Sequence, residues 1–187
     1  MEILRKLYAL LIDLTETIVI AGAIFVVIYA FLFRPFQVNG RSMFPNYQDG
    51  EYILTNLISL RFEPLKRGDV IVFQAPPDAE KDYIKRVIGL PGEKVMIKGG
   101  YVYINGAKLD ESSYLASDVM TSQGSFLTEA KTITVPQDNY FVMGDNRPES
   151  SDSRAWGFVP KQKLIGKSFF VYWPPTRMRL VKGGKYN

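Results

Sequence analysis

The sequence predicts a mainly β domain of antiparallel strands behind one N-terminal membrane-spanning helix. The first observation is an uncharged apolar run from Thr17 to Phe33. The second is a change after Phe36 to short runs of β-branched and aromatic residues, separated by turns that contain Gly or Pro. Short strands joined by turns are typical of antiparallel sheets. We therefore expect a short segment at 1–16, an anchor at 17–33, one folded domain at 34–175 and a basic, frayed tail at 176–187.

The apolar run is long enough to serve as a membrane anchor. At ~1.5 Å per residue it spans roughly 25 Å, slightly less than a ~30 Å hydrocarbon core, and Leu7–Leu14 can lengthen it. A cleaved secretion signal would be shorter and would end in small residues, whereas Arg34-Pro35-Phe36 follows here. A core helix would show a polar face. The sequence predicts an uncleaved anchor, whose orientation the flanking basic residues do not decide.

The domain after the anchor is expected to contain short strands and few helices. Strand-like runs are predicted at 52–54, 69–73, 83–90, 94–97, 101–104, 132–135, 140–143 and 168–173. Asn105-Gly106 predicts a tight hairpin turn. Only Lys161–Ile165 has helical periodicity. Residues 111–130 are polar and serine-rich, and we expect a surface loop without a role.

Composition excludes several kinds of site. The 187 residues are enough for one domain with a real core. The chain has no cysteine and no histidine, which excludes disulfides, thiolate nucleophiles, His-based triads and Cys or His metal sites. The net charge of +4 is spread along the chain, without the basic stripe and stacking aromatics of a nucleic-acid binder. We expect no cofactor, no metal and no nucleic acid, and a membrane surface explains the mild positive charge.

Lys85 and Ser42 are the candidate reactive pair. Lys85 lies inside the strand-like run 83–90, where an ammonium is costly unless it is paired or neutral. Ser42 lies in a segment with the composition of an exposed turn. A serine nucleophile without histidine needs another base, and a desolvated lysine is the recognised alternative. On spacing alone, a solvated lysine and an ordinary turn serine fit better.

Four motifs in a fixed order change that balance. The motifs are Gly40–Pro45, Arg67–Phe73, Asp82–Glu93 and Gly144–Gly157, and they follow the one N-terminal anchor. From the N-terminal apolar segment through about Trp173, the chain therefore resembles the bacterial type I signal peptidases, which are membrane serine–lysine proteases that remove signal peptides from exported proteins. Together the motifs imply the two-sheet antiparallel fold of that family.

The resemblance implies roles for the reactive residues. Ser42 matches the nucleophile, Lys85 the general base, and Ser150 the hydroxyl that orients the lysine. The Ser42 backbone N–H is one candidate donor to the oxyanion. Many family members add a serine or threonine hydroxyl where this chain has Gly40, so a second donor stays open. Asn46, where the family usually has threonine, is a further departure.

The resemblance also implies a substrate site beside the serine. The segment 36–38 is expected to pair with the residues before the cleaved bond as an added β-strand. The side chains that match shallow pockets for small P1 and P3 residues are Phe36, Val38, Met43, Tyr83 and Ile84. Each is also a plausible core residue.

Charged residues of the last two motifs are expected to be structural. We expect ion pairs that hold the Ser150 loop beside Lys85, made by Arg86, Asp145, Arg147, Asp152 and Arg154. Gly144 suits a close backbone approach to the lysine. An acid protease built on Asp145 and Asp152 is disfavoured, because the arginines would keep both carboxylates ionised.

The resemblance implies an endopeptidase in the bacterial inner membrane, with one span and the catalytic domain on the outer face. Its partners would be the signal peptides of exported preproteins and the lipid bilayer. One alternative is an inactive membrane-bound paralogue that acts as an assembly factor, but such proteins typically lack the serine or the lysine. The other is a self-cleaving repressor with the same serine–lysine chemistry, which would carry a DNA-binding head in place of the anchor.

Overall fold

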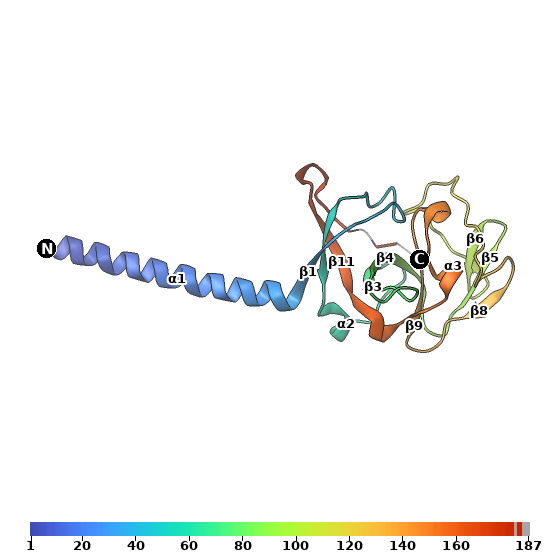
Figure 1. The fold of residues 1–187 in the computed structure, drawn as a ribbon, viewed down its shortest axis with the longest axis horizontal. Coiled ribbons are helices and arrows are strands. Elements are labelled where there is room, and N and C mark those ends of the chain that lie inside the picture. The colour runs from blue at the N-terminus through green and yellow to red at the C-terminus, as the bar shows by residue number, and fades with distance from the viewer. Residues whose placement is uncertain (182, 185–187) are drawn as a thin grey trace.

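A single long helix projects from a folded β domain (Figure 1). The structure is a computed structural model that describes residues 1–181 and 183–184. Helix α1 runs over Glu2–Leu32, so it begins well before Thr17 and includes residues 2–16 of the first segment. Among the described helices, it is the one whose length and composition allow it to cross a membrane, over Glu2–Tyr29. Phe33 is already extended, as expected close to a proline at position 35.

The larger sheet contains eight strands and all its neighbours are antiparallel. Their order is β1-β2-β11-β3-β4-β9-β10, with β12 beside β11. The bounds are β1 Phe33–Gln37, β2 Tyr52–Asn56, β3 Val70–Gln74, β4 Asp82–Gly89, β9 Asn139–Met143, β10 Val159–Pro160, β11 Leu164–Trp173 and β12 Arg179–Leu180. The end of this sheet that holds β1 lies next to α1 (Figure 1). The predicted mainly β fold behind one apolar helix is confirmed.

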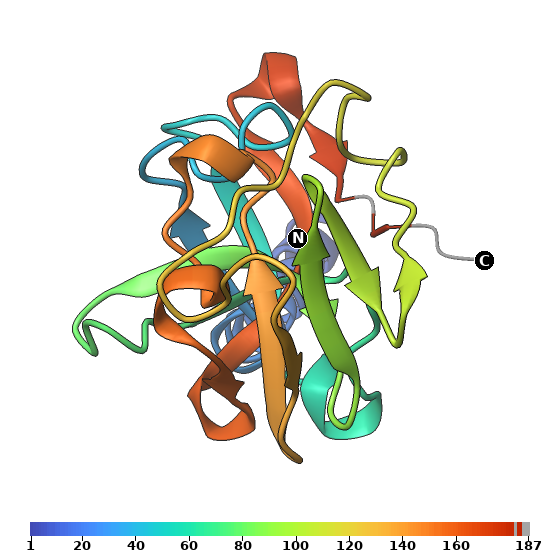
Figure 2. The same cartoon turned by 90° about the vertical axis from the view of Figure 1, so that its right-hand side faces the viewer.

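A smaller antiparallel sheet lies at the end of the domain farthest from α1. Figure 2 shows this sheet facing the viewer, with α1 end-on behind the domain. Its order is β7-β6-β5-β8, with bounds β5 Lys94–Lys98, β6 Tyr101–Ile104, β7 Ala107–Lys108 and β8 Thr132–Thr134. The β6–β7 hairpin turns at Asn105 and Gly106, both with positive φ, as an Asn-Gly turn requires.

Short helices connect the strands. They are α2 Ser59–Phe62, η1 Arg147–Glu149, α3 Ser153–Trp156, η2 Lys161–Lys163 and η3 Pro175–Arg177. The helical periodicity at 161–165 gives only a 3₁₀ turn, because β11 begins at Leu164.

The start of the basic tail is ordered, contrary to the expectation of a frayed end. The short strand β12 pairs with β11 at Phe170 and Val171. Arg179 donates to the buried carboxylate of Glu51, at 2.6 Å from Oε2. This ion pair and the strand pairing fix the segment after Trp173. Residues 182 and 185–187 of the predicted tail lie outside the described residues.

Two apolar clusters position the strands that carry the site. One joins the smaller sheet to β9, through buried Val95 and Ile97 on one side and Phe141 and Met143 on the other. It fixes the end of β9, where the Ser150 loop begins. The second lies below the turn after β1 and includes the fully buried Met43. Burial of such side chains stabilises a fold by about 1.5–3 kcal/mol each, so both segments have fixed positions.

Candidate active site

Ser42 lies in a tight turn after β1 that the core holds in place. Phe44 N donates to the Arg41 carbonyl (3.0 Å), and Tyr47 N donates to the Met43 carbonyl (2.9 Å). The side chain of Met43 is completely buried, so its neighbour Ser42 is held half-buried at the surface of the domain. Asn146 N donates to the Ser42 carbonyl (3.0 Å), which joins this turn to the loop after β9.

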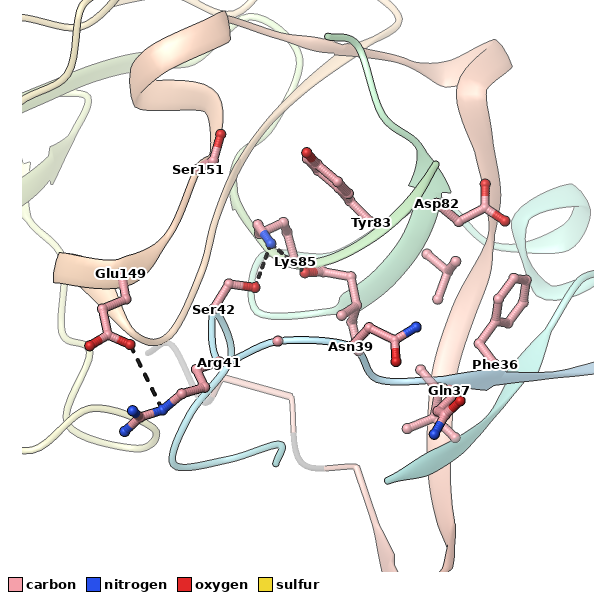
Figure 3. A pocket seen from close by; sticks show the side chains of 14 residues that line it. Phe36, Gln37, Asn39, Arg41, Ser42, Asp82, Tyr83, Lys85, Glu149 and Ser151 are labelled. Carbon is pink, nitrogen blue, oxygen red and sulfur yellow. Dashed lines mark hydrogen bonds and ion pairs between the residues drawn. The ribbon is translucent and has the colours of Figure 1, made fainter. Parts of the chain in front are cut away.

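Lys85 faces Ser42 from strand β4. Its Nζ lies 2.7 Å from Ser42 Oγ and donates to the Ile84 carbonyl at 3.0 Å. Figure 3 shows the two side chains meeting in the middle of a cleft. Only 4% of Lys85 is exposed, and this desolvation lowers its pKa from 10.5 to about 8, although the charges of Asp152 and Asp145 act in the opposite direction. The amine is thus poised to exchange a proton near neutral pH.

Ser150 lies beside the pair, packed against Gly144. A Cβ atom on Gly144 would collide with Ser150 Oγ and with the Ser42 carbonyl oxygen, so only glycine allows these three segments to meet. Ser150 Oγ is buried and has no hydrogen-bond partner among the described residues. A hydrogen bond from Ser150 to Lys85 therefore stays a prediction.

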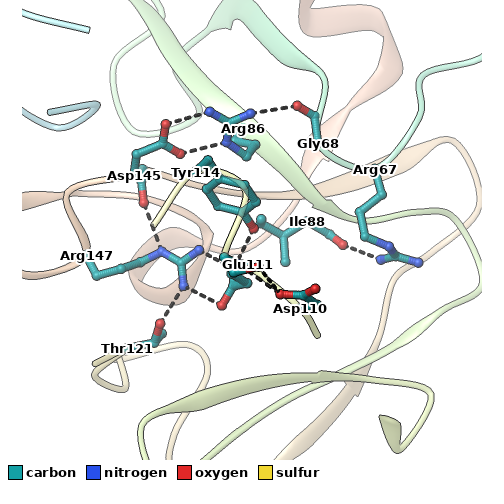
Figure 4. Close-up of polar contacts among 12 residues, drawn as sticks. Arg67, Gly68, Arg86, Ile88, Asp110, Glu111, Tyr114, Thr121, Asp145 and Arg147 are labelled. Carbon is teal, nitrogen blue, oxygen red and sulfur yellow. Dashed lines mark hydrogen bonds and ion pairs between the residues drawn. The ribbon is translucent and has the colours of Figure 1, made fainter. Parts of the chain in front are cut away.

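Two buried ion pairs hold the loop that carries Ser150. Arg86 binds both oxygens of Asp145, at 2.8 and 2.6 Å, and Arg154 binds Asp152 at 2.8 Å from its Nε. Asp152 Oδ2 also accepts from Gly144 N (3.0 Å). Figure 4 shows the Arg86–Asp145 pair and its neighbour Arg147. Separation of a buried ion pair leaves an uncompensated charge and costs much free energy, so these contacts fix the loop relative to β4.

The cleft around the pair has a volume of about 300 Å³. Three of the predicted substrate-binding side chains line it: Phe36, Tyr83 and Ile84. Val38 and Met43 are instead 2% and 0% exposed and lie in the core below. Val38 follows the end of β1 at Gln37, and its backbone N–H and carbonyl are bonded to Glu51 and Gly50. Its side chain packs in the cluster that contains Met43, whereas Phe36 and Gln37 border the cleft.

Two backbone edges border this cleft. Strand β1 is the last strand of its sheet, paired only with β2 among the described residues. In β4, the pairing with β9 begins at Arg86, so residues 82–85 pair only with β3 in the part of the chain that is described. Unpaired edges can accept another extended chain. The arrangement leaves room for a peptide strand between 36–38 and 82–84.

The backbone donors near Ser42 differ in availability. Within the described residues, no hydrogen bond engages the Ser42 N–H. Gly40 N donates to Asp49 Oδ1 at 2.6 Å, and Gly40 has a φ of 91°, a region that favours glycine. The N–H of Ser42 is therefore the available backbone donor for an oxyanion, whereas that of Gly40 is already engaged.

Comparison with known proteins gives the family. A family model described as "Signal peptidase, peptidase S26" matches residues 11–173. Signal peptidase IB of Staphylococcus aureus is 36% identical over 176 residues, which cover 87% of this chain and 91% of that protein. The chain belongs to the signal peptidase family, peptidase S26. It is accordingly a serine endopeptidase of the signal peptidase I type.

A second signal peptidase gives the same match. The probable signal peptidase I-2 of Synechocystis sp. is 38% identical over 176 residues, covering 91% of this chain and 77% of that protein. A solved signal peptidase I from Enterococcus faecalis V583 is 34% identical, with a TM-score of 0.46, and covers 56% of this chain and 97% of that chain.

The segment 111–130 of this signal peptidase is not the surface loop without a role that the sequence predicted. Tyr114 and Leu127 are buried. Glu111 binds the guanidinium of Arg147, which also donates to Thr121. The segment therefore packs against the loop after β9 and neutralises its buried arginine. The three arginines expected to make ion pairs outnumber the two aspartates expected to bind them, and this excess was the signal that could have predicted a further carboxylate elsewhere.

Asn46 connects this segment to the site. Its Nδ2 donates to Asp145 Oδ2 and to the Tyr114 carbonyl, both at 2.8 Å. The amide therefore joins the turn of Ser42, the Arg86–Asp145 pair and the segment 111–130. A threonine hydroxyl at this position has one donor only and would not make both contacts. The departure at Asn46 thus has a structural consequence that the sequence did not reveal.

No metal centre is found among the residues that the structure describes, since no three side chains of the His, Cys, Asp and Glu types converge there. The two carboxylates whose charges act on Lys85, those of Asp145 and Asp152, are engaged by arginines and by backbone or amide donors. Their arrangement matches a structural role better than that of a metal ligand or of a paired-carboxylate acid protease.

Proposed function

We propose that this protein removes N-terminal signal peptides from exported preproteins, with Ser42 as nucleophile and Lys85 as general base. The observation that carries the proposal is the 2.7 Å separation of Lys85 Nζ and Ser42 Oγ, together with the 4% exposure of the lysine. A lysine in this environment gives up its proton far more readily than a solvated one.

The reaction begins with neutral Lys85. Its amine takes the Ser42 proton while Oγ attacks the carbonyl carbon of the scissile bond. The Ser42 N–H donates to the oxyanion of the tetrahedral intermediate. The Lys85 ammonium then protonates the departing amine, which leaves the signal peptide as an ester on Ser42. Lys85, again neutral, takes a proton from water, whose oxygen attacks the ester carbon. The Lys85 ammonium then returns the proton to Ser42 Oγ as the acyl–Oγ bond breaks, and the signal peptide leaves with a new carboxyl group.

Ser150 is proposed to orient the lysine. In its neutral state the Lys85 amine has two N–H donors and one lone pair. The Ile84 carbonyl accepts one donor at 3.0 Å, and the lone pair must face Ser42 for proton transfer. The buried Ser150 hydroxyl, which has no partner among the described residues, is the neighbour chemically suited to accept the second donor.

The substrate strand is proposed to enter between β1 and β4. The residues before the scissile bond would pair with the backbone of 36–38, and their side chains would contact Phe36, Tyr83 and Ile84, which line the cleft. With α1 spanning the bacterial inner membrane, the domain would work at the outer face. There it would meet preproteins while their signal peptides are still in the bilayer.

The test is turnover of a labelled signal-peptide substrate by the full chain. Ser42→Ala and Lys85→Ala are each expected to lose activity by roughly 10³-fold or more while the protein stays folded, and the double variant to lose no more than either single, because the two residues act as a unit. An inactive assembly factor would show no turnover in the unmodified chain. Substantial turnover by folded Lys85→Ala would remove the lysine from the mechanism.

A further inference from the structure

The base of the anchor is rigidly joined to the domain. Leu57 N donates to the Leu32 carbonyl at the last residue of α1 (3.0 Å). Directly after the helix, the ring of Phe33 packs on that of Phe169 in β11, with centroids 5.4 Å apart. If α1 crosses a bilayer, the end of the domain formed by β1, β2 and β11 must lie against the lipid headgroups.

Helix α2 lies at the same end of the domain (Figure 1). Asn56, the last residue of β2, fixes its start, because Asn56 Oδ1 accepts from Ile58 N and Ser59 N at 2.9 Å each. Leu60 packs into the core, while Phe62 is 79% exposed. A large aromatic side chain held in water on a fixed element gains free energy when another apolar surface covers it.

A groove of about 720 Å³ opens beside α2. Its wall contains the leucine side chains of Leu57, Leu60, Leu65 and Leu164. Its polar groups include three exposed cations, Arg34, Arg61 and Lys161, and one carboxylate, Glu63. Within the described residues, none of these three cations takes part in an ion pair.

We propose that this groove binds anionic phospholipid of the membrane that α1 crosses, with Phe62 inserted among the lipids. The apolar wall suits acyl chains, and the three cations suit phosphate headgroups at the interface. Phe62 beside Arg61 is the pairing of apolar and basic side chains that interfacial helices use. We favour lipid over another protein as the occupant, because α1 is joined to this end of the domain and already holds the groove at the bilayer. The domain would then sit on the bilayer in one orientation.

A spin label at position 62 tests the proposal directly. The chain has no cysteine, so Phe62→Cys places a nitroxide at one known site in the full-length protein. Met120→Cys is the matched control, since Met120 is also exposed (53%) and lies in the segment 111–130. In vesicles of phosphatidylcholine with phosphatidylglycerol, the label at 62 is expected to lose collisions with a water-soluble nickel complex and to keep those with oxygen. The label at 120 is expected to keep both.

The charge requirement is tested in the same vesicles. Arg61→Gln combined with Lys161→Gln is expected to restore nickel collisions at position 62. Lys108→Gln combined with Lys131→Gln removes the same charge from the distant smaller sheet and its neighbouring loop, and is expected to have no effect. Vesicles of phosphatidylcholine alone should give weaker protection, and inorganic phosphate added to them should not increase it.

Three results would overturn the proposal. The first is a label at 62 as accessible to nickel as the label at 120 in anionic vesicles. The second is protection that inorganic phosphate reproduces, which would indicate a phosphate site without lipid. The third is protection that disappears when the protein is diluted in the membrane, which would indicate a second copy of the chain. All of these measurements are spectroscopic, so their outcomes do not depend on whether Ser42 and Lys85 cleave signal peptides.

Discussion

At the scale of single residues, burial of Lys85 has opposite effects on the proposed proton transfer and on the stability of the fold. Burial lowers its pKa from 10.5 to about 8, which makes a neutral amine available for proton transfer. The same burial means that near neutral pH much of the protein holds a desolvated ammonium. One unit of pKa corresponds to about 1.4 kcal/mol, so the protonated lysine destabilises the fold by on the order of 3 kcal/mol.

Replacement of the lysine should therefore stabilise the protein. Lys85→Met keeps most of the packing and removes the buried charge, so we expect its free energy of unfolding to exceed that of the unmodified protein by about 1–3 kcal/mol at pH 7. Between pH 8 and 10.5 the unfolded chain binds a proton at Lys85 that the folded chain does not. The unmodified protein thus gains stability as pH rises through this window, and the advantage of Lys85→Met should shrink.

Denaturant unfolding of both proteins in micelles at pH 7 and near pH 10 measures this difference. Lys66→Met is a suitable control, because Lys66 is exposed and its replacement should leave stability within about 0.5 kcal/mol at both pH values. An advantage of Lys85→Met that does not change with pH would contradict the lowered pKa.

The sequence predicted that Ser42 and Lys85 meet, and it predicted the ion pairs and the close approach at Gly144 beside them. The meeting of Ser42 and Lys85 could be predicted because a serine without histidine requires another base, and because motifs surround both residues. The inward orientation of Val38 and Met43 could not be predicted from the sequence, since it depends on the core below the turn. The contacts of Asn46 could not be predicted either, because they join residues about 70 and 100 positions apart and no local sequence pattern indicates them.

At the scale of elements, the segment 111–130 supports the loop that carries Ser150. Arg147 is completely buried, and its guanidinium is bound by Glu111, whose side chain is 11% exposed. Arg154 donates to the Arg147 carbonyl at 2.7 Å and so connects the same loop to Asp152. The position of Ser150 therefore depends on a segment that has no regular secondary structure and lies apart in the sequence.

Removal of Glu111 should destabilise the protein and weaken catalysis. Glu111→Ala leaves the Arg147 charge buried without its carboxylate, which costs about 3–5 kcal/mol. Thermal unfolding should show a large fall in Tm, and kcat should fall at temperatures where the variant is still folded, because the Ser150 loop loses its support. Asp118→Ala is the matched control: it removes the same charge from an exposed position in the same segment, and both quantities should stay unchanged.

Most strands could be predicted because alternation and β-branched residues are local signals. The start of β11 was placed too late, since register shifts between Leu164 and Gly166 interrupt its pairing with β3. The strands β7, β10 and β12 contain two residues each, which is too short for any periodicity. The structure of 111–130 was missed because polar residues mark a loop whether or not its backbone packs on a partner.

At the scale of the whole molecule, the anchor and the cleft are directly connected. β1 begins at Phe33, immediately after α1, and the chain from Phe33 to Ser42 spans at most about 30 Å. If α1 crosses the bilayer as we propose, the cleft stays close to the membrane surface. A substrate held in the same bilayer would then meet the cleft at a high effective concentration, although no described side chain of α1 lines it.

Removal of α1 should separate the contribution of the anchor, which is effective concentration, from the chemistry of the cleft. A chain that begins at Phe33 keeps β1 whole and should cleave a soluble peptide with an unchanged kcat. Its rate on a preprotein held in vesicles should fall by on the order of 10² or more, because the effective concentration is lost. Equal rates for the truncated and full chains on the vesicle-bound substrate would contradict this role of the anchor.

The most direct test of the serine–lysine mechanism is to titrate Lys85 and to measure activity over the same pH range. Lys85 labelled with ¹⁵N at Nζ can be followed by NMR in Ser42→Ala, and kcat/KM can be measured in the unmodified protein. We expect both to change with an apparent pKa near 8, with activity rising as Lys85 loses its proton. A Lys85 that titrates like a solvated lysine, while activity is already full at neutral pH, would contradict the mechanism.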